Sequence, residues 1–351
     1  MLEFYDGFDN YTQSADLTAY GWLSSGSSAL KPGRFTYSGF PSNSLEPNNS
    51  SWSLQYSPNL YLPSGALASR TIGFAWLLRS GSSAYGPLIT LWSGNTAQFS
   101  LCYTGGTAQL FVQQGTSSSA PSAGETCSGT YLPNQWYYIE VQFTLNGASS
   151  SVSIQIDGIN VLTATGLNLD PAGSATANIL SFNAIANGPD DFDDVYVVNP
   201  TGSAPTSFLG VSQIIYCPPT ADSTHGNNAW APNSGTTEYT QVNGQSESAS
   251  TTYINATAVG AASTFGITLP AFNGTIDAVK LKACVKQTDA GVHTVAAVFE
   301  TSGTNYVSSN TASVGTNYAG AQSIMTVNPA TSHAFTAADV TTGEIGITVV
   351  S

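Results

Sequence analysis

The feature that most constrains the fold is a succession of short apolar runs, each closed by a cluster of Gly, Ser, Asn or Pro. In the run Trp136–Phe143, for example, Tyr137, Ile139 and Val141 alternate with their neighbours and would share one face of a strand. No stretch of about twelve residues carries apolar residues at helical spacing with capping residues at its ends. The pattern predicts an all-β chain and excludes a helical domain.

The strands expected in the first half follow one another closely. An Asp157-Gly158 pair separates two alternating runs and predicts a hairpin, because a type I′ turn needs positive φ at both central residues. Besides Trp136–Phe143, we predict strands at Ile72–Arg79, Leu88–Trp92, Phe99–Tyr103, Gln109–Gln113, Ser151–Ile156, Ile159–Thr163 and Val195–Val198.

A Pro-, Gly- and Ser-rich segment, Asn199–Thr206, predicts a boundary between two domains, residues 1–200 and 207–351. The second domain is expected to be a smaller β-sandwich with one helical turn at Thr336–Val340. Its predicted strands are Val211–Tyr216, Tyr239–Val242, Ile276–Lys282, His293–Glu300 and Glu344–Val350.

The charge balance excludes several classes of partner. Only 8% of residues are charged and the net charge is -14, with seven Lys and Arg in all. A basic groove for nucleic acid cannot be built from so few cations, and an anionic membrane surface would repel the chain. No apolar run is long enough to span a membrane, and no signal peptide is expected after Met1.

The cysteines and histidines are not spaced as metal ligands usually are. His225, His293 and His333 are far apart in the sequence, and no CxxC occurs. Cys102 and Cys127 flank a predicted hairpin, so they are candidates for a disulfide; the alternative is that both are buried free thiols.

The densest charge is the run that contains Asp190, Asp191, Asp193 and Asp194. Calcium prefers carboxylate oxygens, so Asp191, Asp193 and Asp194 are the candidate ligands of a Ca²⁺ cofactor. The alternative is that these side chains accept hydrogen bonds from backbone amides of an opposite loop. The sequence leaves both interpretations open.

Glycoside hydrolysis by a retaining mechanism needs two carboxyl groups about 5 Å apart. The Glu-x-Asp-x-x-Glu pattern that supplies them on one strand is missing, because Glu140 is followed by Gln142 and Leu145 at the positions that matter. We therefore expect no catalytic residues and a protein that is not an enzyme.

Tryptophans near turn-rich segments are candidates for sugar stacking. Trp22 and Trp92 are the residues that we predict for a glycan site, with packing in the core as the alternative.

Four segments of the first half form a recognisable set: Phe4–Asp9, Trp136–Val141, Gln155–Gly158 and Phe192–Val197. In these segments the first half resembles the concanavalin A-like lectin and laminin-G superfamily, which implies a jelly-roll β-sandwich over residues 1–200.

A second set of segments lies in the second half: Phe208–Gly210, Pro219–Asp222, Ile276–Val279, Asp289–Gly291, Asn328–Thr331, Phe335-Thr336 and Gly343–Gly346. In these segments the second half is similar to the C-terminal module of certain tailed-phage virion proteins.

This resemblance implies a virion structural protein, a head decoration, fibre or tail appendage, assembled in the host cytoplasm. Its expected partners are other virion proteins and further copies of the same chain, with residues 207–351 as the attachment module. The alternative function is a glycan-binding adhesin that recognises the host cell surface.

Overall fold

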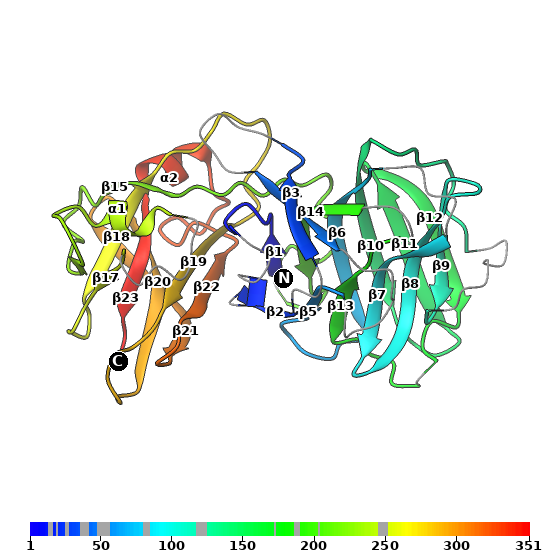
Figure 1. Cartoon of the computed structure of the whole chain (residues 1–351), viewed down its shortest axis with the longest axis horizontal. Helices are drawn as coiled ribbons and strands as arrows, with labels where there is room; N and C mark the ends of the chain where they lie inside the picture. Colours follow the sequence, from blue (N-terminus) through cyan, green and yellow to red (C-terminus); the bar gives the residue numbers. More distant parts are fainter. Residues whose placement is uncertain are drawn as a thin grey trace. The chain divides into compact units, whose positions relative to one another are not determined.

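The computed structural model describes the whole chain apart from residues 13–16, 19, 25–27, 36–41, 48–56, 80–84, 117–124, 172, 186–189, 203 and 245–251. The described residues form many strands and two short helices, which confirms the all-β prediction. The chain divides into two compact units, Met1–Ile215 and Tyr216–Ser351 (Figure 1). No helix in the described ranges is long and apolar enough to cross a membrane.

The first unit contains an eight-stranded antiparallel sheet. Its strands are β1 (Leu2–Asp6), β3 (Ser28–Pro32), β4 (Asn43–Pro47), β6 (Ser69–Leu78), β10 (Trp136–Thr144), β11 (Ser150–Ile156), β12 (Ile159–Leu167) and β14 (Asp190–Val198). They lie in the order β12-β11-β10-β6-β14-β4-β3, and β1 pairs with β14.

A six-stranded antiparallel sheet forms the second layer of the first unit. Its strands are β2 (Trp22–Ser24), β5 (Asn59–Tyr61), β7 (Tyr85–Ser93), β8 (Thr96–Thr104), β9 (Gln109–Gln114) and β13 (Ile179–Phe182), in the order β2-β5-β13-β7-β8-β9. Phe74 and Ile139 from the eight-stranded sheet share one apolar core with Leu101 and Phe182 from the six-stranded sheet. The unit is therefore a β-sandwich whose inner faces make a single core.

Local patterns account for this register. Tyr137, Ile139, Val141 and Phe143 of β10 all belong to the core, as their alternation predicts. The hairpin between β11 and β12 turns at Asp157-Gly158, where φ is 51° and 78°. Positive φ at both residues confirms the predicted turn.

The second unit is also built from antiparallel strands. They are β15 (Pro219–Asp222), β16 (Ala231–Pro232), β17 (Ile254–Asn255), β18 (Ala262–Ile267), β19 (Val279–Val285), β20 (His293–Thr301), β21 (Thr304–Val314), β22 (Ala319–Met325) and β23 (Glu344–Val349), with α1 (Tyr239–Val242) and α2 (Ala337–Thr342). One sheet has the order β15-β18-β23-β20-β21, and β16-β17 and β19-β22 form separate pairs. Val279 of β19 and Met325 of β22 pack on a core around Phe299.

Two of the predicted strands are wrong. Val211–Tyr216 is not a strand; the Ile214 amide donates to Asp194 Oδ1 at 2.7 Å instead of joining a sheet. Tyr239–Val242 forms the one-turn helix α1, whose first amide donates to Asp222 Oδ1 at 2.6 Å. In both segments a buried or nearby carboxylate takes a backbone donor that strand pairing would otherwise use.

Candidate functional site

The aspartates of β14 contact backbone amides and Arg side chains from other segments of the chain. Asp193 Oδ2 accepts the Arg34 amide at 2.8 Å, and Asp194 Oδ1 accepts the Ile214 amide at 2.7 Å. Asp191 forms an ion pair with Arg79, and Asp194 Oδ2 lies 3.6 Å from Arg34 Nη1. Among the described residues, these carboxylates face cations and backbone amides, and the calcium site stays a prediction. The alternative, acceptance from an opposite loop, describes what the structure contains.

Burial makes these carboxyl groups hard to ionise. Burial raises the pKa of Asp190 to about 7, although Asp190 accepts hydrogen bonds from the Ile185 amide and the Trp76 indole. It raises the pKa of Asp191 to about 6 against the opposing effect of Arg79. Burial likewise raises the pKa of Asp194 to about 6.

Glu140 has a structural role on the outer face of the eight-stranded sheet. It is fully buried, and its Oε1 accepts the amides of Leu209 and Gly210, each at 2.9 Å, and the Tyr196 hydroxyl. These contacts and the Asp194–Ile214 bond hold residues 208–214, which we call the strap, against the outer face of the sheet. Residues 201–215 therefore stay with the first unit, although the predicted domain ended at residue 200.

Cys102 and Cys127 are both buried and both free. Cys102 pairs with Phe111 across β8 and β9, and Phe111 is bridged in turn to Thr126. Since directly paired residues point to the same face, Cys127, the residue after Thr126, points to the opposite face, where it joins the core. The disulfide does not form in this structure, because the sheet separates the two thiols.

Trp22 is a core residue and cannot stack on a sugar in this structure. It is 2% exposed, its ring contacts Phe4, Phe8 and Phe182, and its indole N–H donates to Asp6 Oδ2 at 3.1 Å. The packing alternative describes this residue.

Trp92 lies on the outer face of the six-stranded sheet. It is directly opposite Ile179, which is opposite Tyr61, so these three side chains form a row across β7, β13 and β5. Trp92 is 7% exposed, whereas Tyr61 is 53% exposed. Tyr61 is therefore an accessible aromatic residue on this face, and the sequence did not single it out.

A second row on this face consists only of neutral hydrogen-bonding side chains. Strand register places one residue from each of five neighbouring strands in line: Asn59, Ser181, Thr90, Ser100 and Gln113. We call this set the polar row. All five side chains are buried, and the residues beside them in sequence, such as Leu91 and Leu101, enter the core. The polar row therefore faces away from the core.

Hydrogen bonds join two pairs of neighbouring side chains in the polar row. Thr90 Oγ1 and Ser100 Oγ are 2.9 Å apart, and the Ser181 hydroxyl donates to Asn59 Oδ1. Two polar atoms at this end of the sheet have no hydrogen-bond partner among the described residues: the indole N–H of Trp92 and Oε1 of Gln98. Buried donors and acceptors are paired in the great majority of cases, so this unpaired donor and acceptor mark the face as a candidate ligand site.

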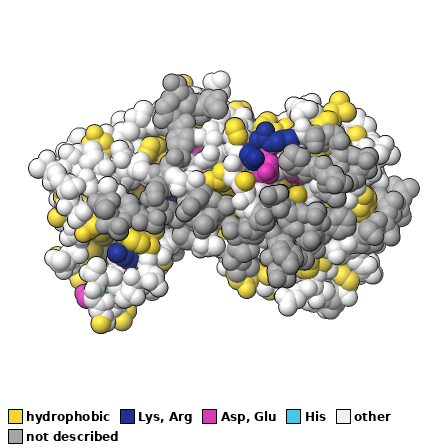
Figure 2. Space-filling view, viewed as in Figure 1, with side chains coloured by type: hydrophobic (Ala, Val, Ile, Leu, Met, Phe, Trp, Pro, Cys, Tyr) yellow, Lys and Arg dark blue, Asp and Glu magenta, His cyan; other side chains and the backbone are white. Residues whose placement is uncertain are grey.

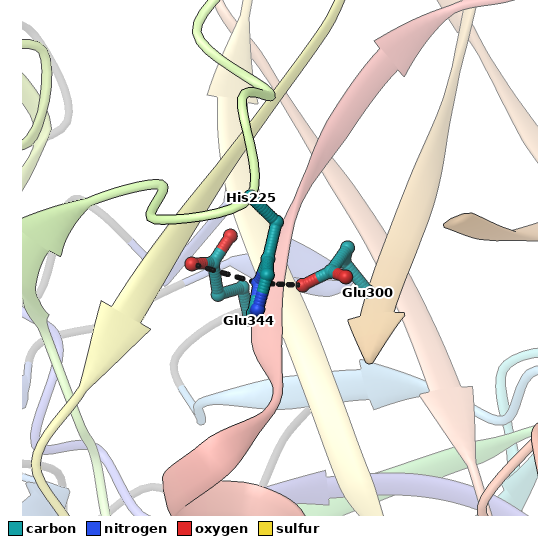
Figure 3. A group of neighbouring side chains, drawn as sticks. All are labelled: His225, Glu300 and Glu344. Atoms are coloured by element: carbon teal, nitrogen blue, oxygen red, sulfur yellow. Dashed lines mark ion pairs between the residues drawn. The ribbon is translucent and has the colours of Figure 1, made fainter. Parts of the chain in front are cut away.

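The second unit contains a different cluster, shown in Figure 3. Glu300 near the end of β20 and Glu344 at the start of β23 lie on either side of His225, which comes from the loop after β15. His225 Nδ1 is 2.6 Å from Glu300 Oε2 and 3.3 Å from Glu344 Oε1. The fold thus joins one of the three scattered histidines to two carboxylates.

Hydroxyl and amide donors fix the orientation of Glu344. Its Oε2 accepts the hydroxyls of Ser223 and Thr264 at 2.6 and 2.7 Å, and its Oε1 accepts the Thr224 amide and hydroxyl at 2.7 and 2.9 Å. Although burial opposes ionisation, these hydrogen bonds together lower the pKa of Glu344. The cluster was not predicted from sequence, although a Glu at the end of each apolar run, His293–Glu300 and Glu344–Val350, was a usable signal.

Comparison with known proteins finds similarity in the fold only. No protein-family model matches the chain, and no curated protein matches it. An endo-β-1,4-glucuronan lyase from the fungus Trichoderma reesei is similar over 56% of this chain and 95% of its own, with 12% identity and a TM-score of 0.38.

Two further solved structures are similar at the same level. An alginate lyase variant in complex with alginate tetrasaccharide covers 55% of this chain and 95% of its own, with 13% identity and a TM-score of 0.37. A galectin from Caenorhabditis elegans covers 42% and 95%, with 14% identity and a TM-score of 0.30. All three are sandwich-type β folds, which is compatible with the jelly-roll expectation. None of the three is named as a phage protein.

The expectation that the chain is not an enzyme is contradicted by this comparison, because polysaccharide lyases are among the similar structures. The sequence lacks the Glu-x-Asp-x-x-Glu hydrolase pattern, but the absence of one pattern does not exclude other chemistry on a sandwich fold. With 12–14% identity and TM-scores of 0.30–0.38, the likeness concerns the fold and assigns no activity to this chain.

Proposed function

We propose that the first unit binds a neutral glycan on the outer face of its six-stranded sheet, beside Tyr61 and the polar row. The observation that carries the proposal is the unpaired Trp92 N–H and Gln98 Oε1 on this face. A sugar hydroxyl both donates and accepts a hydrogen bond, so hydroxyl groups can pair with both atoms. The exposed ring of Tyr61 offers an apolar surface on which a sugar can stack.

The charge distribution favours a neutral ligand. The polar row contains Asn, Ser, Thr and Gln and no ionisable group, and the chain as a whole carries a net charge of -14. Charged side chains are also sparse on the described surface in Figure 2. An acidic polysaccharide would meet repulsion without a compensating cluster of Lys or Arg.

Binding of the full chain to a panel of neutral polysaccharides, measured by glycan array and then by calorimetry, tests this proposal. Tyr61→Ala should weaken binding about tenfold, or about 1.4 kcal/mol. Trp92→Phe should weaken binding by a similar factor without lowering stability, because it removes a buried donor that has no protein partner. The same incubations, assayed for released oligosaccharides, show whether a bound glycan is also cleaved.

Trp22→Phe is the matched control. It removes an indole N–H that donates to Asp6 in the core, so it should lower stability and leave glycan affinity of the folded protein unchanged. Wild-type binding by both Tyr61→Ala and Trp92→Phe, or no neutral glycan bound at all, would contradict the proposal.

A second proposed function is the virion role, in which the second unit attaches the chain to a particle. Val259, Val292 and Val350 are 70%, 85% and 39% exposed. The Val350 amide donates to Thr294, two residues after Val292, and the Gly260 amide donates to Val349, so the three valines lie at one end of the unit. Exposed apolar side chains that gather in this way suit a protein contact. Antibody-gold labelling of purified particles is expected to mark the head or the tail, and unlabelled particles would refute the role.

A further inference from the structure

The strongest unexplained feature of the second unit is a pair of buried like charges. Glu300 of β20 and Glu344 of β23 are directly opposite each other across the two strands. They are 0% and 3% exposed. Like charges in directly opposite positions destabilise a sheet, and buried charges are costly unless a counter-charge lies close by. A cation between the two carboxylates would offset this cost.

One carboxylate oxygen of Glu300 faces His225 and has no hydrogen-bond partner among the described residues. Glu300 Oε1 accepts the Gly303 amide at 2.6 Å, whereas Glu300 Oε2 is buried and makes no hydrogen bond among the described residues. Its near neighbour is His225 Nδ1, at 2.6 Å. The side chains of His225 and Glu300 point toward each other from different elements (Figure 3).

Hydrogen bonds hold Glu344, on the other side of His225, in one orientation. Glu344 is held by hydrogen bonds from Ser223, Thr224 and Thr264, which come from the loop after β15 and from β18. Donors of this kind fix the direction of a metal-ligating carboxylate and are typical of the surroundings of a metal site. His225 follows Thr224 directly, so the same loop carries a ligand and the groups that orient another ligand.

We propose that His225 Nδ1, Glu300 Oε2 and Glu344 Oε1 bind one divalent transition-metal ion of the Zn²⁺ type. The three ligand atoms lie within 4.8 Å of one another. Zinc takes imidazole nitrogen and carboxylate oxygen at about 2.0–2.2 Å, so two ligands of a tetrahedral ion are about 3.4 Å apart.

The observed separations are close to this requirement. His225 Nδ1 and Glu344 Oε1, at 3.3 Å, already have the spacing of two zinc ligands, and Glu300 Oε2 needs to withdraw by less than about 1 Å. An imidazole binds a metal through a deprotonated nitrogen, so any proton on His225 Nδ1 leaves when the ion binds. The His225 side chain is 33% exposed, which gives the ion a path from solvent and a side open to water.

A second histidine provides a matched control. His293 Nε2 lies 2.8 Å from Asp289 Oδ1 on the same unit, but the side chains are 37% and 66% exposed and only one carboxylate is present. Such a pair is a weak, adventitious metal ligand at most. His293→Ala should therefore leave specific metal binding unchanged.

The experiment is a titration of the full chain, dialysed against EDTA, with ZnCl₂ by calorimetry and with CoCl₂ by absorption spectroscopy. We expect one equivalent to bind, a rise in thermal midpoint on binding, and the visible absorption bands of low-coordinate Co²⁺. Glu300→Gln and His225→Ala should each weaken binding about 10- to 100-fold, while His293→Ala binds as the wild type does.

Glu300→Gln keeps the shape of the side chain, so it reports on the site even where His225→Ala fails to fold. Three results would overturn the proposal: no stoichiometric binding to the wild type, wild-type affinity in Glu300→Gln, or loss of binding in His293→Ala, which would show an adventitious surface ion only. Failure here leaves glycan binding by the first unit untouched, since the two sites share no residue.

Discussion

At the scale of single residues, several of the few acidic side chains serve as internal hydrogen-bond acceptors. Asp6 accepts the Tyr11 hydroxyl at 2.5 Å, the Trp22 indole at 3.1 Å and the Phe8 amide at 3.1 Å. Glu140 and Asp194 do the same for the strap. A carboxylate offers several lone pairs to donors in an interior where each unpaired group is costly. Acidic residues in such a chain are therefore poor markers of catalysis until their partners are known.

Glu140 gives a prediction at this scale. Glu140→Ala leaves the amides of Leu209 and Gly210 and the Tyr196 hydroxyl without their acceptor, so the free energy of unfolding should fall by about 3 kcal/mol or more. Glu140→Gln keeps an acceptor oxygen in place and should cost only about 1 kcal/mol. Urea unfolding of both variants measures the difference, and equal stability of the two would show that the strap does not depend on Glu140.

The proximity of the candidate metal ligands could not be predicted from the sequence. His225, Glu300 and Glu344 are separated by long stretches of chain, and their meeting depends on the register that places Glu300 opposite Glu344. Strand periodicity predicts which residues share a face, but it does not predict which strands become neighbours.

At the scale of elements, alternation was a reliable guide where a strand has one face in a core. The range predicted for β10, Trp136–Phe143, differs from the observed strand by one residue at its end, and the Asp157-Gly158 turn has the expected backbone. The prediction failed for Val211–Tyr216, where no residue is fully buried and the Ile214 amide donates to the Asp194 carboxylate instead of a neighbouring strand. An apolar run alone therefore does not define a strand, because the partners of its backbone amides decide between a strand and a strap.

Strand β14 predicts a pH dependence of stability. Its carboxyl groups have raised pKa values in the folded state, about 7 for Asp190 and about 6 for Asp191, against about 3.9 in an unfolded chain. Between these values the folded state binds more protons than the unfolded state does, so stability should fall as pH rises from about 4 to about 7. Each pKa unit corresponds to about 1.4 kcal/mol.

Urea midpoints across this pH range, on the wild type and on Asp190→Asn, measure the effect. The variant has no proton to lose at this position, so its stability should depend less on pH. A wild-type stability that rises over the whole range would contradict the raised pKa values of β14.

At the scale of the whole molecule, the two units have separate cores, and the strap belongs to the first. A fragment of residues 1–215 should therefore be more stable than one of residues 1–200, by about 2 kcal/mol or more, because the shorter fragment lacks the amides that pair with Glu140 and Asp194. Thermal unfolding of the two fragments tests this. Equal midpoints would place the strap outside the cooperative unit.

The polar row has a consequence for the conditions that the first unit can tolerate. Its cross-strand contacts join uncharged groups, so dissolved ions do not screen them as they screen a partly exposed ion pair such as Lys31 and Glu46, 3.4 Å apart. Raising the ionic strength from low to high should weaken that ion pair and leave the hydrogen bonds of the polar row intact. The six-stranded layer is thus built to keep its shape, and any ligand held by it, across changes of salinity.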